Sequence, residues 1–288
     1  MAEVMKTVIS ASRRTDLVAS FPGWLASALR AKSARVIGPS GRIVEIDLSP
    51  ERVHTLVLWS KDFANLLGNK GGLRDLLAAY QQIYCHFTIT GLGGTAIEPG
   101  SPAMDAALAQ IPGLVALAGR AERVTIRFDP IVFWQEGGSR RSNLPCFERV
   151  AEAAAPPGIR DVRISFAQWY GKARRRASRR GFSFVDPPDA EKIALAAGLA
   201  ARARTLGLGI YACSQPLLAA AEGIAPSSCI DGRLLESLHP NREPVSLKKD
   251  RTQRAGCLCT ESKDIGSYTQ ACPHGCVYCY ANPVIGNS

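Results

Sequence analysis

The stretch Thr7-Val8-Ile9-Ser10-Ala11-Ser12 is rich in β-branched and small residues and runs directly into the polar Arg13-Arg14-Thr15-Asp16. This pattern indicates a buried strand that ends at a polar edge. Similar runs occur at 55–59, 83–90, 123–128, 162–166 and 209–213. Helical patterns lie between them, most clearly at 22–31, 102–117 and 190–206. Strands that alternate with helices predict a parallel sheet covered by helices.

This alternation predicts an α/β fold, which we expect to be a TIM-like (β/α) barrel, complete or partial. A doubly wound open sheet is the alternative, because periodicity does not show whether a sheet closes. From about residue 243 the alternation stops and the sequence becomes polar and rich in cysteine. We expect residues 1–288 to form one domain, with 243–288 as a cysteine-rich, cluster-binding tail. Residues 35–37 and 42–47 flank the turn Pro39-Ser40-Gly41 and predict a hairpin.

The composition is that of an ordinary globular protein, with 288 residues, 46% hydrophobic and 21% charged side chains. The sequence has no uninterrupted apolar run of about 18 residues and no apolar signal segment, so we expect a cytoplasmic protein with no membrane partner. The formal net charge of +10 favours polyanionic partners, although many basic enzymes bind none. The sequence contains no nucleophile elbow, no P-loop and no HExxH run.

Charged and polar side chains gather where the predicted strands end. Ligands of α/β folds bind at the carboxyl ends of the strands, so a rim of Arg, Lys, Asp and Gln could bind an anionic or zwitterionic ligand. For any single residue the simpler interpretation is that the ends of strands are polar in most proteins. The candidate rim residues are Arg13, Arg14, Asp16, Lys61, Arg127, Asp129 and Gln168.

Five of the nine cysteines fall within residues 257–279, and such clustering predicts metal binding rather than disulfides. The most specific part is the CxxxCxxC run of Cys272, Cys276 and Cys279. Three thiolates at this spacing can hold a [4Fe–4S] cluster from one loop and leave one iron without a protein ligand, as an activating site requires. Zinc is the alternative metal, with His274 or Cys257 as its fourth ligand.

Four other cysteines predict a possible second metal site, which would hold a second iron–sulfur cluster or zinc. Its members are Cys213, Cys229, Cys257 and Cys259. Cys257 and Cys259 form a CxC pair that the three-cysteine motif does not need. The alternative is that Cys213 and Cys229 are small buried residues, which is a common fate of free cysteine. We expect the remaining Cys85 and Cys146 to be structural.

The segment from Cys272 to Tyr280 resembles the cluster motif of radical S-adenosylmethionine enzymes, and its CxYCY ending is similar to that of spore photoproduct lyases. More closely, the chain resembles an uncharacterised bacterial family catalogued as domain of unknown function 1848. The matching stretches are 9–16, 127–130, 228–231 and 257–280. This resemblance implies a cluster-binding barrel and names no substrate.

The resemblance to radical S-adenosylmethionine enzymes implies that the cluster binds S-adenosylmethionine. Reduction by a flavodoxin or ferredoxin would then give a 5′-deoxyadenosyl radical. In those enzymes the cluster loop follows the first strand, whereas here it follows all the other predicted strands. A shared chemistry therefore predicts a permuted arrangement, in which a strand at 264–270 pairs beside the first strand. Arg14 and Asp16 would contact S-adenosylmethionine, and Tyr278 and Tyr280 would cover the cluster.

The run from Lys172 to Arg180 carries six cations in nine residues. Trp169 and Tyr170 precede it, and cations beside aromatic rings are typical of single-stranded nucleic-acid binding. A solvated basic surface is the simpler interpretation. The alternative function is therefore a nucleic-acid-binding or repair-associated protein with a structural zinc or iron–sulfur site, and a third is an electron-transfer protein with two clusters. The substrate, small molecule or nucleic acid, stays open.

Overall fold

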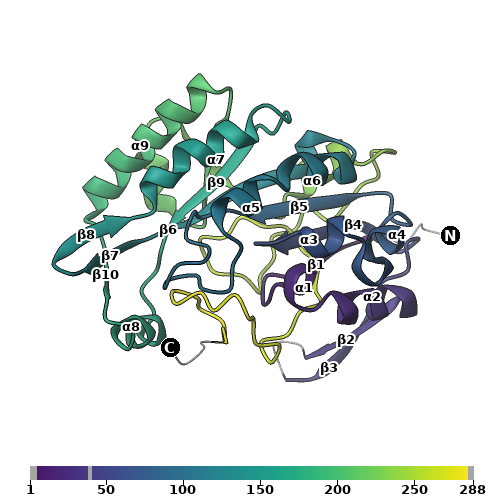
Figure 1. Cartoon of the computed structure of the whole chain (residues 1–288). Helices are drawn as coiled ribbons and strands as arrows, with labels where there is room; N and C mark the ends of the chain where they lie inside the picture. The colour runs from purple at the N-terminus through teal and green to yellow at the C-terminus, as the bar shows by residue number, and fades with distance from the viewer. Residues whose placement is uncertain (1–4, 38–40, 285–288) are drawn as a thin grey trace.

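Eight parallel strands form the main sheet of the computed structural model, which describes residues 5–37 and 41–284. The strand order is β12-β11-β9-β6-β5-β4-β1-β13. Figure 1 labels β9, β6, β5, β4 and β1 of this sheet. The strands are β1 (Thr7–Ala11), β4 (Val53–Ser60), β5 (Ile83–Thr88), β6 (Val124–Ile131), β9 (Asp161–Phe166), β11 (Gly209–Cys213), β12 (Ile224–Ser227) and β13 (Lys263–Asp264). The predicted α/β fold with parallel strands is confirmed.

The last strand, β13, returns to the start of the sheet and pairs in parallel with β1, where Asp264 lies opposite Ser10. The predicted pairing beside the first strand is therefore confirmed, although β13 covers Lys263–Asp264 instead of 264–270. From β1 to β12 the order runs in one direction, as in a (β/α) barrel, whereas a doubly wound sheet reverses its order. Within the described residues β12 and β13 form no ladder with each other, so the sheet is open there.

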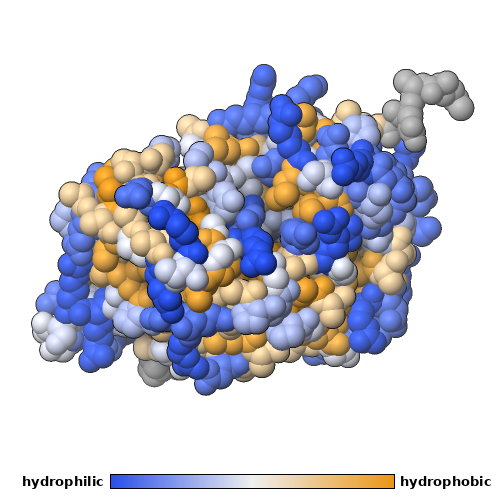
Figure 2. Space-filling model, turned by 90° about the horizontal axis from the view of Figure 1, so that it is seen from above, coloured by the Kyte–Doolittle hydropathy of each residue, from blue (hydrophilic) through white to orange (hydrophobic). Residues whose placement is uncertain are grey.

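Helices cover the outer face of the sheet because alternate strand residues, such as Ile9, Leu56 and Ile126, point into one apolar core. Helices α5, α6, α7 and α9 lie along this face (Figure 1). The helices on this side are α1 (Leu17–Ser20), α2 (Pro22–Ala31), α3 (Ala64–Leu67), α4 (Leu73–Leu77), α5 (Met104–Leu108), α6 (Ile111–Ala118), α7 (Phe147–Ala154) and α9 (Asp189–Thr205). Their outer surfaces mix hydrophilic and hydrophobic residues (Figure 2). None of the helices in the described residues is both long and apolar enough to cross a lipid bilayer.

The inner face of the sheet packs against the C-terminal part of the chain. Val8, Val57 and Tyr84 form a second buried cluster with helix α10 (Gly232–Leu238) and with residues 245–259. Figure 1 shows this segment, in yellow-green and yellow, crossing the side of the sheet that the outer helices leave uncovered. The cysteine-rich tail therefore lies against the strands from which the predicted rim residues project.

One predicted helix differs from the structure, and one hairpin has no counterpart among the sequence predictions. The helix predicted at 102–117 is divided into α5 and α6, because Pro112 is tolerated only in the first turn of a helix and so begins a new one. Residues 137–143, which lack a strand pattern, hold the turn of a hairpin between β7 (Phe133–Glu136) and β8 (Ser139–Ser142). Gly137 and Gly138 both have positive φ, as a two-residue hairpin turn requires.

The small hairpin predicted around residues 35–47 is confirmed, with β2 (Ser33–Ile37) antiparallel to β3 (Ile43–Asp47). Pro39 and Ser40 of its predicted turn lie outside the described residues. Strand β10 (Ser183–Val185) completes a three-stranded sheet with β7 and β8. The basic run forms helix α8 (Gly171–Ser178), which precedes β10.

Candidate functional site

The site begins with the carboxylate of Asp264, which ties the C-terminal segment to the end of β1. This carboxylate accepts hydrogen bonds from the hydroxyls of Ser10 and Ser12, both at 2.7 Å, and from the backbone N–H of Arg13 at 2.8 Å. At Gly266 a Cβ would lie 2.0 Å from the Ser12 Oγ, so the close approach needs glycine. From there the chain runs past the carboxyl end of β1 and into the cysteine loop, residues 272–279.

The cysteine loop is held against the segment that follows β5. The backbone N–H of Gly100 donates to the carbonyl of His274 at 2.9 Å, and the N–H of Val277 donates to the carbonyl of Ile97 at 2.9 Å. Gly275 has a positive φ, and a Cβ there would lie 3.0 Å from the carbonyl oxygen of Val284. Glycine is therefore needed for the tight path of the loop, as the sequence indicates.

Asp16 anchors the same loop through His274. Its carboxylate accepts hydrogen bonds from His274 Nε2 at 2.8 Å, from the Ser60 hydroxyl and from the backbone N–H of Lys61 at 2.9 Å, and it caps α1. Burial alone would lower the pKa of His274, but the hydrogen bond and charge of Asp16 raise it above the ordinary value. His274 Nδ1 lies 3.1 Å from the carbonyl oxygen of Gly100. Both ring nitrogens therefore have oxygen partners within the protein.

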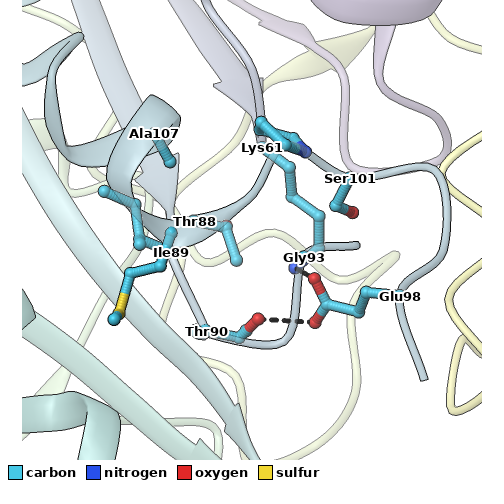
Figure 3. A pocket seen from close by; sticks show the side chains of 11 residues that line it. Lys61, Thr88, Ile89, Thr90, Gly93, Glu98, Ser101 and Ala107 are labelled. Carbon is cyan, nitrogen blue, oxygen red and sulfur yellow. Dashed lines mark hydrogen bonds and ion pairs between the residues drawn. The ribbon is translucent and has the colours of Figure 1, made fainter. Parts of the chain in front are cut away.

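Glu98, which no sequence pattern singles out, is the centre of a buried network beside the loop. It accepts hydrogen bonds from Lys61 Nζ at 3.0 Å, from the Thr90 hydroxyl at 2.6 Å and from the Tyr278 hydroxyl. Figure 3 shows Lys61, Thr90 and Glu98 pointing toward one another at the wall of a small pocket. Burial favours a neutral Glu98, but the charge of Lys61 and the hydrogen bonds from Thr90, Tyr278 and Lys61 together outweigh burial and lower the pKa of Glu98. Glu98 is therefore an ionised partner of Lys61.

The three cysteines of the loop lie close together in a largely buried position. Burial raises the pKa of Cys272 to about 11, and it also raises the pKa values of Cys276 and Cys279. A charge on Cys279 would raise the pKa values of both other thiols, so the three lie within electrostatic reach of one another. Buried thiols with raised pKa values stay protonated unless a cation compensates the thiolate charge.

Helix α8 also holds the cysteine loop, through hydrogen bonds from Arg176. Arg176 Nε donates to the carbonyl of Val277 at 3.0 Å, and its guanidinium also donates to the carbonyl of Cys279. Other cations of the helix, including Arg174 and Arg175, are exposed. Within the basic run, Arg176 therefore contacts the cysteine loop, whereas Arg174 and Arg175 are exposed.

The four cysteines of the predicted second site lie together on the inner side of the sheet. They are Cys213, Cys229, Cys257 and Cys259. The sulfur atoms of Cys213 and Cys229 are 3.2 Å apart. Cys259 lies in the same buried cluster as Cys229, and Cys213 and Cys257 pack against this cluster. Hydrogen bonding from Cys259 lowers the pKa of Cys257 to about 6, while hydrogen bonding and burial raise that of Cys259. The set predicted from the sequence is thus brought together from three separate segments.

Most of the predicted rim residues have partners within the protein. Arg14 donates to the carbonyls of Gly266 and Ile37, and Arg13 pairs with Asp250 at 3.3 Å. Arg127 pairs with Asp129 and lies 5.3 Å from the centre of the Trp59 ring. Gln168 is exposed and accepts a hydrogen bond from Arg254. Tyr280 is also partly exposed, and its hydroxyl donates to the carbonyl of Arg13.

The donor chemistry of both cysteine groups suits a thiophilic metal. Within residues 5–37 and 41–284, no three His, Cys, Asp or Glu side chains stand in an arrangement that could hold a metal ion as it is. The three loop thiolates of a four-iron cluster bind three different iron atoms, so they need not surround one point.

Comparison with known proteins shows the family. A family model described as Domain of unknown function (DUF1848) matches residues 8–281. No curated protein matches the chain. The matched span includes both cysteine groups, the Asp264 contact with β1 and the Glu98 network. The chain therefore belongs to the family of the domain of unknown function DUF1848.

Proposed function

We propose that the chain is an iron–sulfur enzyme of the radical S-adenosylmethionine type, with a [4Fe–4S] cluster on Cys272, Cys276 and Cys279. The observation that carries the proposal is the parallel pairing of β13 with β1. It brings the cysteine loop to the carboxyl ends of the strands, where α/β enzymes bind their ligands. We infer that the sheet is a permuted (β/α) barrel, open between β12 and β13, whose cluster-bearing strand comes last in sequence.

The protein side chains around the loop favour an iron–sulfur cluster over zinc. A Cys3His zinc site would need a free nitrogen of His274, but both ring nitrogens have oxygen partners. Cys257, the other candidate for a fourth ligand, packs against the buried cluster that contains Cys229 and Cys259. A bound four-iron cluster with an open iron supplies S-adenosylmethionine binding and, after reduction by a flavodoxin or ferredoxin, its cleavage to a 5′-deoxyadenosyl radical.

The residues around the loop position it and keep water away. Asp16 holds His274, Arg176 holds the carbonyls at the other end of the loop, and Glu98 holds Tyr278. Low solvent access protects reactive intermediates and strengthens the electrostatic interactions inside a site. We therefore assign Asp16 to positioning the loop.

Arg14 also acts on the loop, because it binds the carbonyl of Gly266 just before the cysteines. It is a positioning residue in this proposal, and its expected contact with S-adenosylmethionine stays a prediction. The other rim residues remain candidates for contact with cofactor or substrate. These candidates are Arg13, Lys61, Arg127, Asp129 and Gln168.

Metal and sulfide analysis of protein purified without oxygen tests the proposal. We expect four irons and four sulfides more in the wild type than in Cys276→Ala. We also expect an EPR signal that S-adenosylmethionine shifts, and release of 5′-deoxyadenosine on reduction. Cys85→Ala, which removes a buried cysteine of strand β5, is the control and should retain all three properties. An iron-loaded wild type that releases no 5′-deoxyadenosine would contradict the enzymatic proposal.

Nucleic-acid binding is a second candidate because α8 lies directly beside the cysteine loop. The guanidinium of Arg176 contacts the loop, while Arg174, Arg175 and Arg179 expose their side chains next to it. A structural metal site on a nucleic-acid-binding protein would release no 5′-deoxyadenosine. It would instead bind single-stranded oligonucleotides with a steep dependence on salt concentration, which Arg174→Ala with Arg175→Ala should reduce.

A further inference from the structure

Four cysteines outside the loop come together from three distant parts of the chain. Cys213 ends strand β11, Cys229 follows strand β12, and Cys257 and Cys259 belong to the tail. The Cys213 and Cys229 sulfurs are 3.2 Å apart, and Cys257 and Cys259 pack in the same buried cluster. Cysteines that are close in sequence often lie close together in a fold. Here three separate segments each bring cysteine to the same place, which indicates a shared role for the thiols.

The surroundings of these sulfurs supply hydrogen-bond donors instead of apolar contacts alone. The guanidinium of Arg127 donates to Cys229 Sγ at 2.8 Å and lies 3.8 Å from Cys213 Sγ. The backbone N–H of Ile230 donates to Cys259 Sγ at 3.3 Å. Donors of this kind stabilise thiolates, which are the form in which cysteine binds metal. A cysteine that only fills space would need none of them.

Arg127 gives an independent argument, because a buried guanidinium needs anionic partners. Asp129 supplies one negative charge, and the guanidinium also faces the sulfurs of Cys213 and Cys229. Its side chain is only 11% exposed. Metal-bound thiolates would give the Arg127 guanidinium further anionic partners. Hydrogen bonds of this kind, from a second layer of residues, orient metal ligands and tune their properties.

We infer that Cys213, Cys229, Cys257 and Cys259 form a second, thiolate-bound metal centre that is separate from the cluster of the cysteine loop. The chemistry of four thiolates suits either an iron–sulfur cluster or a tetrahedral zinc ion. On binding, each thiol that is still protonated gives up its proton to solvent, and sulfur–metal bonds replace the hydrogen bonds between the sulfurs. No oxidation of cysteine is involved.

Metal binding requires the sulfur atoms of this group to move from their present positions. Two sulfurs on one tetrahedral zinc ion lie about 3.8 Å apart, as Zn–S bonds of about 2.3 Å require. Cys213 and Cys229 are closer than that, at 3.2 Å, so their sulfurs must part before they can share an ion. Rotation of a cysteine side chain about its Cα–Cβ bond moves the sulfur without moving the backbone.

Reciprocal variants test the inference independently of the proposed function. Iron, zinc and sulfide are measured on wild type, on Cys257→Ser with Cys259→Ser, and on Cys272→Ser with Cys276→Ser, all purified without oxygen. We expect the first pair to lose one metal centre and to retain the centre of the loop. The loop pair should retain the centre of the four cysteines even if the loop binds nothing. Cys85→Ala is again the control.

Metal content that stays at the wild-type level in Cys257→Ser with Cys259→Ser would overturn the inference. Loss of sulfide together with iron identifies an iron–sulfur cluster, whereas loss of zinc alone identifies a tetrahedral zinc site. If that pair does not fold, cobalt(II) is added to the loop variant after chelation. Thiolate-to-cobalt absorption there supports the centre, and a spectrum without it contradicts the centre.

Discussion

Ser10 and Asp264 face each other on neighbouring parallel strands, and the Ser10 hydroxyl donates to the Asp264 carboxylate at 2.7 Å across a separation of 254 positions. The indole N–H of Trp59 donates to the same Ser10 hydroxyl at 3.1 Å. The hydroxyl of Ser12 and the N–H of Arg13 also donate to Asp264. One carboxylate therefore joins the cysteine-rich tail to the first strand.

Replacement of Asp264 by Ala should destabilise the protein and loosen the tail. The change leaves two buried hydroxyls and the backbone N–H groups of Arg13 and Gly266 without their acceptor, which should lower the free energy of unfolding by about 2–4 kcal/mol. Urea unfolding measures this difference. Asp105→Ala, which changes an exposed carboxylate, should cost less than about 1 kcal/mol. Equal effects of the two substitutions would show that Asp264 does not anchor the tail.

Arg176→Ala should open the cysteine loop, because it removes the guanidinium that holds the carbonyls of Val277 and Cys279. We expect faster alkylation of the loop cysteines, followed by mass spectrometry of the labelled peptide. Arg175→Ala removes an exposed arginine of the same helix and should leave the alkylation rate unchanged. If both variants react at the wild-type rate, α8 does not hold the loop.

Glu98→Gln should be strongly destabilising because it leaves the ammonium of Lys61 without its buried carboxylate partner. Breaking a buried ion pair from one side typically costs about 3–5 kcal/mol. The double variant Glu98→Gln with Lys61→Met removes both charges and should recover much of this loss. Thermal unfolding of the single and double variants measures the coupling. A double variant less stable than either single one would contradict the pairing.

Acid should destabilise the protein through His54 and His239, whose rings stack at 4.5 Å. Burial lowers the pKa values of both, and that of His239 falls to about 4. The unfolded chain therefore binds more protons below about pH 6.5, so stability falls as the pH drops from there toward 4. We expect each histidine to contribute at most about 1.4 kcal/mol per pH unit.

The substitution His239→Asn tests this pH dependence, because asparagine does not titrate. Urea unfolding at pH 7, 6 and 5 should show a shallower loss of stability in the variant than in the wild type. The hydrogen bond from Lys6 lowers the pKa of the neighbouring Glu243 carboxyl, so this group stays ionised between pH 7 and 5. Parallel curves for the two proteins would place the acid sensitivity elsewhere.

The parallel strands were predictable because both of their faces are buried. Runs such as Val8-Ile9 and Leu56-Val57 are apolar on consecutive positions, which is typical of strands buried on both sides. The place of the cysteine loop beside the first strand was also predictable, because the expected chemistry needs it there. Its strand is only two residues long, so its length could not be predicted from a residue pattern.

Glu98 shows why part of the site could not be predicted. It lies in an irregular segment after β5. Its partner Lys61 precedes it and its partner Tyr278 follows it, both at long distances along the chain. No periodicity marks such a residue, since only the tertiary fold brings its partners together. The same applies to the Asp16 contact with His274, because Asp16 was predictable as a polar strand end but its partner was not.

The pairing of β13 with β1 also sets an order of events on the ribosome. The separation of 254 positions between Ser10 and Asp264 corresponds to about 10–50 s of translation at roughly 5–20 residues per second. During this interval one edge of β1 has no strand beside it, and an unpaired edge can pair with other chains. The tail therefore covers this edge of β1 last. A cofactor that depends on the tail binds to a sheet whose other strands have already been synthesised.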